Sequence, residues 1–102
     1  MGFFDLFKTN DINDEVANRS DSSVLLDVRE ADEYKSGHIP GAVNFPLSTL
    51  NQAELPWDKG SELLVYCLAG TRSRKAVSFL QSRGFTNVRN IGGIHSYRGS
   101  VE

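Results

Sequence analysis

The stretch ELLVYCLAGTRSRK, residues 62–75, joins an apolar run to a glycine-containing loop and a cationic segment. The apolar run does not alternate with polar residues, which is typical of a strand buried on both faces by helices. The cationic segment opens the clearest helical pattern of the chain, residues 73–83, which ends before Gly84. This order predicts a strand, a short loop and a helix, with Cys67 at the carboxyl end of the strand.

Shorter patterns predict the remaining elements. Further strands are expected over residues 23–28, 42–45 and 87–91. Helices are expected over residues 12–19 and 33–36, where Asn10 or Asp11 can cap the first and Asp32 the second. Because strands and helices alternate along the chain, the fold class predicted is α/β with a parallel sheet.

Composition sets broad limits on the function. A chain of 102 residues with 39% apolar residues is expected to form one domain, residues 1–102, and a net charge of −2 gives no pull towards nucleic acid. One cysteine cannot form an internal disulfide, and no apolar run approaches the ~20 residues of a membrane span. We therefore expect a cytoplasmic monomer. Its Phe-rich segment, residues 3–7, is expected to pack on the domain as a first strand or cover rather than to dock on a membrane or partner.

The residues around Cys67 favour a reactive thiol. Open α/β sheets bind ligands at the carboxyl ends of their strands. A loop from Leu68 to Arg72 that curls around the sulfur would direct backbone N–H groups and a helix N-terminus at one point, which stabilises a thiolate. Gly70 permits the positive φ of a tight loop, and Arg72 and Arg74 add positive charge. The alternative is a buried strand-end cysteine beside solvated cations.

Four segments together resemble a single-domain rhodanese. They are LLDVRE (25–30), EYKSGHIPGAVNFP (33–46), YCLAGTRS (66–73) and NIGGIHSY (90–97). The resemblance implies a parallel five-stranded sheet with helices on both faces. It also implies a sulfurtransferase of the thiosulfate sulfurtransferase type, which needs no cofactor. Such an enzyme moves sulfane sulfur from thiosulfate or a persulfide to a thiol or cyanide, and a protein acceptor is a further candidate partner.

The same resemblance assigns roles to individual residues. Cys67 would be the catalytic nucleophile and the persulfide carrier. The substrate-binding cradle of N–H donors would comprise Leu68, Ala69, Gly70, Thr71, Arg72 and Ser73. The Arg72 side chain would face the donor anion. The family commonly has Trp where this chain has Tyr97, a difference that concerns the wall of the pocket.

Other motif residues have a favoured structural role. Asp27 and Arg29 end a predicted strand on the same sheet edge as Cys67, so they are candidates for the pocket, but an ion pair or loop hydrogen bond is the favoured reading. His38 lies among turn residues and is given a structural role, whereas His95 could reach the pocket. One cysteine and two scattered histidines lack the spacing of a metal site.

Two rival functions stay open. A cysteine-based phosphatase also uses a thiolate in an N–H-lined loop, but four residues separate Cys67 from Arg72, and phosphatase loops are one residue longer. The tighter loop suits a sulfur atom better than a phosphoryl group. The second rival is a persulfide carrier or interaction module that serves a protein partner without turnover.

Overall fold

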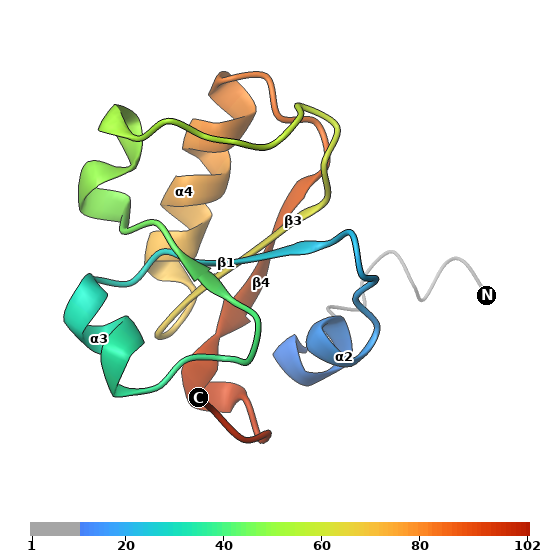
Figure 1. Cartoon of the computed structure of the whole chain (residues 1–102), viewed down its shortest axis with the longest axis vertical. Helices are drawn as coiled ribbons and strands as arrows, with labels where there is room; N and C mark the ends of the chain where they lie inside the picture. Colours follow the sequence, from blue (N-terminus) through green and yellow to red (C-terminus); the bar gives the residue numbers. More distant parts are fainter. Residues whose placement is uncertain (1–10) are drawn as a thin grey trace.

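The computed structural model describes residues 11–102, in which helices alternate with strands (Figure 1). The helices are α2 (Ile12–Ala17), α3 (Ala31–Ser36) and α4 (Thr71–Ser82), with two 3-10 helices, η1 (Leu47–Gln52) and η2 (Ile94–Ser96). The strands are β1 (Val24–Asp27), β2 (Val43–Asn44), β3 (Leu63–Cys67) and β4 (Val88–Gly93). The α/β class is confirmed. No helix between residues 11 and 102 has the length and apolar character to cross a membrane.

The strands form one parallel sheet in the order β2-β1-β3-β4. β3 lies between β1 and β4, and all five of its residues are buried, which explains its continuous apolar sequence. The register of β3 against β4 shifts between Val65 and Tyr66, which pair with Asn90 and Gly92. Ile91 is therefore an extra residue in β4, and this β-bulge lies close to the end of β3 that carries the thiol.

The expected fifth strand is not part of the described structure. The sheet within residues 11–102 has four strands, so the prediction of five is wrong for this part of the chain. The first element of the described chain, α2, is a helix, because Asp11 caps its N-terminus and Ile12 is its buried residue. Residues 3–7, the segment expected to form a first strand or cover, lie outside the described residues.

Alternate residues of the central strands build a core on each face of the sheet. One core contains Leu26 and Val65 and packs against α4 and η1. The other contains Leu25 and Leu64 and packs against Ile12 of α2. Because both faces are covered, β3 is held rigidly, and the position of its last residue is fixed by the two cores.

The starts of the first two helices differ in how well the sequence predicted them. Asp11 caps α2, as expected, and its side chain accepts a 3.0 Å hydrogen bond from the backbone N–H of Asp14. α3 begins two residues earlier than expected, after Glu30 rather than after Asp32. Glu30 and Glu33 form a reciprocal capping box, which satisfies more N–H groups than a single aspartate cap.

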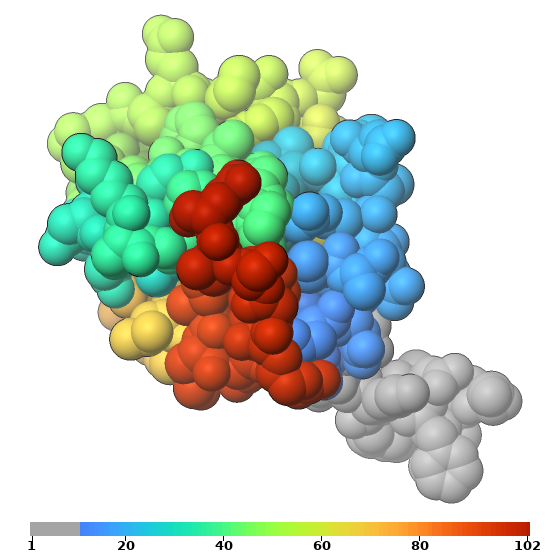
Figure 2. All heavy atoms as spheres, turned by 60° about the horizontal axis from the view of Figure 1, so that its bottom comes forward, coloured from blue at the N-terminus to red at the C-terminus, as the bar shows by residue number. Residues whose placement is uncertain are grey.

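The segment after α3 is joined to the C-terminal residues. His38 and Glu102 exchange two backbone hydrogen bonds, of 3.1 and 2.9 Å, and Figure 2 shows the C-terminal residues lying against this region. The His38 ring stacks on Tyr34 with 3.7 Å between ring centroids. His38 thus packs within the turn, in keeping with the structural role that its neighbours suggested.

Candidate active site

The loop after β3 turns directly into α4. The sequence predicted that this helix begins at Ser73, but it begins at Thr71. Gly70 precedes it with φ of 101°, a left-handed conformation that glycine adopts without the cost paid by other residues. The earlier start matters because it brings the N-terminal N–H groups of the helix close to the end of β3.

The sulfur of Cys67 lies inside this loop. Its Sγ accepts hydrogen bonds from the backbone N–H of Gly70 at 3.0 Å and from that of Ser73 at 3.3 Å. Cys67 is only 1% exposed. The loop therefore curls around the sulfur and directs donors at it, whereas Leu68 at the start of the loop is 47% exposed.

These contacts stabilise the thiolate. Burial raises the pKa of the Cys67 thiol, but hydrogen bonds from the Ser73 hydroxyl and from the N–H groups of Ser73, Gly70 and Ala69 outweigh it. The pKa of Cys67 consequently lies below the ordinary value of a cysteine. A thiolate held by hydrogen bonds in a buried loop is an activated nucleophile.

Asn90 of β4 braces the loop, and the sequence analysis did not identify it. Its Nδ2 donates to the carbonyl of Gly70 at 3.0 Å, while its Oδ1 accepts from the Ser73 hydroxyl at 2.7 Å and from Gly92 N–H at 2.9 Å. The Ser73 oxygen lies 3.4 Å from the Cys67 sulfur. Asn90 thus links the thiol loop, the start of α4 and the bulged strand. An asparagine two residues before the Gly92-Gly93 pair was the only sequence signal for this role.

Gly93 provides the surface against which the loop packs. A Cβ atom added at Gly93 would clash with the carbonyl oxygen of Leu68 and lie 2.6 Å from the Cα atom of Ala69. Because Gly93 itself has φ of −124°, glycine is needed here for the close approach of two backbones and not for an unusual conformation.

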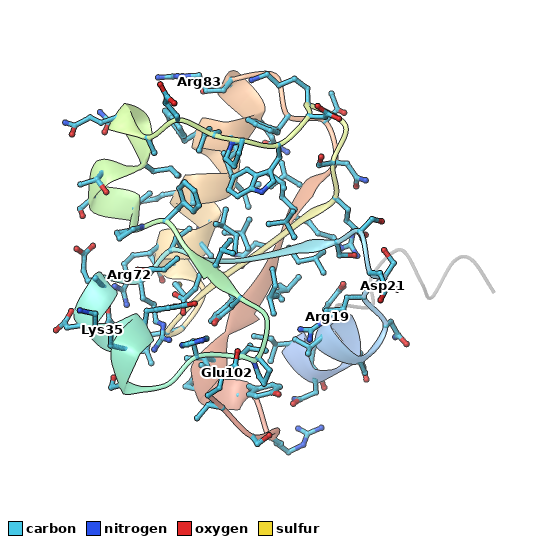
Figure 3. All side chains as sticks on the ribbon, viewed as in Figure 1. Arg19, Asp21, Lys35, Arg72, Arg83 and Glu102 are labelled. Carbon is cyan, nitrogen blue, oxygen red and sulfur yellow. The ribbon has the colours of Figure 1, made fainter. Side chains whose placement is uncertain are left out.

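Arg72 is bound to a carboxylate. Its two terminal nitrogens donate to the two carboxylate oxygens of Glu33 on α3, at 2.7 and 3.0 Å. Figure 3 shows the labelled Arg72 side chain lying over α3. The sequence analysis expected this guanidinium to face a donor anion, and it did not foresee the partner 39 residues away.

Asp27 and Arg29 form a buried ion pair. Both side chains are nearly inaccessible, and the Arg29 Nη2 lies 2.8 Å from Asp27 Oδ2 and donates at 2.8 Å to the carbonyl of Gly37. Asp27 Oδ1 also accepts the Arg29 backbone N–H at 2.9 Å. This arrangement is the structural alternative given above for these residues, since it fixes the chain between β1 and α3.

His95 contacts the loop through the backbone of Leu68. Its Nδ1 lies 2.8 Å from the carbonyl oxygen of Leu68, and its backbone N–H donates to the same oxygen at 3.2 Å.

An open groove of about 460 Å³ runs along the outer side of the loop. Its lining includes Gly70, Thr71, Arg74, Asn90 and His95. Tyr97 packs partly buried against the core beside α2.

Residues 11–102 contain no group of three or more His, Cys, Asp or Glu side chains that could hold a metal ion.

The sequence of residues 12–100 matches the rhodanese-like domain family. The chain belongs to this family. The order of elements and the cysteine at the carboxyl end of a central parallel strand are therefore those of a rhodanese-like domain.

Several known proteins similar to this rhodanese-like domain have names that refer to sulfur, and others are named tRNA uridine(34) hydroxylases. Thiosulfate sulfurtransferase PspE from Escherichia coli is 38% identical over 68% of this chain and 68% of its own length. The putative sulfur carrier protein YrkF from Bacillus subtilis is 35% identical over 81% of this chain, but the chain spans only 46% of YrkF and 30% of another relative. The crystal structure of the Alr3790 protein from Anabaena superposes with a TM-score of 0.79, at 28% identity, over 91% of this chain and 80% of that one.

Proposed function

We propose that the protein is a sulfurtransferase that carries sulfane sulfur on Cys67, taking it from thiosulfate or a persulfide and passing it to a thiol or cyanide. The observation that carries this proposal is the position of the Cys67 sulfur, buried in the loop with N–H donors at 3.0 and 3.3 Å. These donors stabilise negative charge on sulfur before and after transfer. Family membership supports the same chemistry.

The first half-reaction loads the cysteine. The Cys67 thiolate attacks the outer sulfur of the donor, a new S–S bond forms, and the donor's S–S bond breaks. With thiosulfate, sulfite leaves with the bonding electron pair, and the negative charge passes to the terminal sulfur of the Cys67 persulfide. No external oxidant or reductant is needed. N–H groups of the loop between Leu68 and Ser73 would hold the added sulfur, as the resemblance implies.

The second half-reaction empties the cysteine. Cyanide attacks the terminal sulfur of the persulfide and leaves as thiocyanate, or a thiol attacks it and leaves as a new persulfide. In both cases the Cys67 thiolate is the leaving group and is regenerated. Because the chain has a single cysteine, the persulfide cannot be resolved internally and waits for an external acceptor.

A carrier that serves one protein partner is the second candidate. The similarity to a putative sulfur carrier protein favours it. The two functions share the loading step and differ in whether small acceptors discharge the persulfide. We expect a cofactor-free cytoplasmic monomer in either case.

Intact mass measurement of the protein after incubation with thiosulfate tests the proposal. Wild type should gain the mass of one sulfur atom and lose it when cyanide is added, with thiocyanate formed in equal amount. Cys67→Ser and Cys67→Ala should gain none while keeping the wild-type unfolding temperature within a few degrees, because neither side chain can form a persulfide. Discharge by a partner protein alone would favour the carrier, and sulfur transfer by the Ser variant would disprove both.

A further inference from the structure

The guanidinium of Arg72 is already committed to a carboxylate. Both of its terminal nitrogens donate to Glu33, at 2.7 and 3.0 Å, in a bidentate contact that joins α4 to α3. Such a contact uses the planar fork of the guanidinium that would otherwise bind an oxyanion. A donor anion that approaches the loop therefore has to compete with Glu33 for Arg72.

Glu33 is fixed in this position by its own helix. Its Oε1 accepts the backbone N–H of Glu30 at 2.9 Å as part of the capping box of α3. The hydrogen bond from Arg72 lowers the pKa of Glu33 to about 2, although burial opposes the shift. The carboxylate is therefore charged at neutral pH and anchored, so it cannot readily swing away to release Arg72.

The other charged groups near the loop do not replace Arg72. Arg29 is buried against Asp27. Glu30 adds a second carboxylate whose charge is felt by Arg72. Arg74 lines the groove on the outer side of the loop, and Cys67 is not among the residues that line this groove. Within the described part of the chain, the one cation expected to meet a donor is thus matched by carboxylates.

We propose that Glu33 is a specificity-determining residue that neutralises Arg72 and turns the site away from dianionic thiosulfate, in favour of sulfur donors with one negative charge and an organic group. Leu68, next to the nucleophile and 47% exposed, offers such a group an apolar contact. The inference rests on the proposed function, since it concerns which donor loads Cys67.

Two donors that react by the same step provide the test. Thiosulfate carries two negative charges, and methanethiosulfonate carries one charge and a methyl group. Both give their outer sulfur to Cys67, with sulfite or methanesulfinate as the leaving group. We expect Glu33→Gln to raise kcat/KM for thiosulfate about tenfold and that for methanethiosulfonate less than about threefold, because the Gln side chain keeps its size and lacks the charge.

Two control variants separate this effect from general charge changes. Asp32→Asn removes an exposed carboxylate of the same helix and should leave the ratio of the two kcat/KM values within about twofold of wild type. In the Arg72→Gln background, Glu33→Gln should no longer raise thiosulfate use, because no guanidinium is released.

The wild-type protein gives a reading that needs no variant. Salt should raise its kcat/KM for thiosulfate or leave it unchanged, because Arg72, the cation expected to meet the dianion, is already paired with Glu33. A fall with salt, or an unchanged donor ratio in folded Glu33→Gln, would overturn the inference. If intact mass shows that neither donor adds sulfur to Cys67, the proposed function is wrong. If both donors add sulfur and Glu33→Gln leaves the ratio of their kcat/KM values unchanged, the proposed function stands and only the role given to Glu33 is wrong.

Discussion

The Ser73 hydroxyl lies 2.7 Å from the Oδ1 atom of Asn90, an atom that can only accept a hydrogen bond. The single hydroxyl proton of Ser73 therefore points at Asn90 while Cys67 is a neutral thiol, and the thiol can donate to the Ser73 oxygen at 3.4 Å. When the thiolate forms, the hydroxyl can rotate and donate to sulfur. Asn90 Oδ1 then keeps the 2.9 Å bond from Gly92 N–H, so the rotation does not leave this oxygen without a partner.

This relationship predicts the effect of Ser73→Ala on the thiol. Removing a hydrogen bond to a charged sulfur should raise the pKa of Cys67, since such bonds stabilise the charged form by roughly 1.5–3 kcal/mol. The measurement is the pH dependence of alkylation by iodoacetamide, whose wild-type inflection should lie below that of free cysteine. Ser82→Ala, near the far end of α4, is the matched control and should not move the inflection. An unchanged inflection in Ser73→Ala would show that the backbone donors suffice.

Gly93→Ala should disrupt the loop that holds Cys67. The added methyl group would meet the backbone of Leu68 and Ala69, which cannot yield as a flexible side chain would. We expect a loss of about 1–3 kcal/mol in the free energy of unfolding and a slower alkylation of the thiol at neutral pH. Gly60→Ala is the control, because nothing lies within 4 Å of a Cβ atom at that position. Equal stability of the two variants would argue against the close packing of β4 on the loop.

The Glu33–Arg72 pair should make stability depend on pH in the acid range. The pKa of Glu33 is about 2 in the folded protein and 4.5 for an unperturbed glutamate, so the pair stabilises the fold above pH 4.5 and this contribution is lost as the pH falls towards 2. Because both side chains are partly exposed, the contribution should stay below about 1 kcal/mol.

Urea unfolding at a series of pH values measures this effect. Glu33→Gln should flatten the acid part of the stability curve, whereas Lys35→Gln on the exposed side of α3 should only displace it. A curve for Glu33→Gln that runs parallel to wild type would mean that the ion pair contributes nothing to the folded state.

Loop size predicts which thiolate chemistry the protein performs. Phosphoryl transfer needs donors around several oxygens, and the loop between Cys67 and Arg72 has only four residues, with Arg72 bound to Glu33. The protein should show no appreciable hydrolysis of p-nitrophenyl phosphate under conditions in which sulfur transfer is readily measured. Insertion of one glycine after Gly70 should widen the loop and reduce sulfur transfer. Phosphate hydrolysis that depends on Cys67 and outpaces sulfur transfer would reverse the assignment.

Local sequence patterns predicted much of the sheet and the place of the thiol. The runs at residues 23–28 and 62–67 became β1 and β3, because two-sided burial leaves an unmistakable apolar pattern. Helix starts were less predictable: the capping box of Glu30 and Glu33 competes with the simple cap expected at Asp32. Gly70 starts α4 two residues before its apolar pattern indicates.

The contacts that tune the site could not be predicted, because they join residues far apart in the chain. Asn90 reaches Ser73 through the bulge in β4, and nothing in a single sequence marks which strand residue will face a loop. Arg72 and Glu33 meet only once α3 and α4 are packed. The sequence indicated a cationic site, and the structure shows that its central cation is matched by a carboxylate.

The depth of Cys67 also limits what oxidation can do to the protein. A disulfide between two molecules requires the Cβ atoms of the two cysteines to approach to about 4 Å. With each Cys67 only 1% exposed inside its own loop, two such loops would collide long before their sulfurs could bond. Oxygen-derived oxidants are small enough to enter the loop. Oxidation should therefore convert Cys67 to sulfenic and sulfinic acids without linking two chains. Covalent dimers on a non-reducing gel would therefore report unfolded molecules.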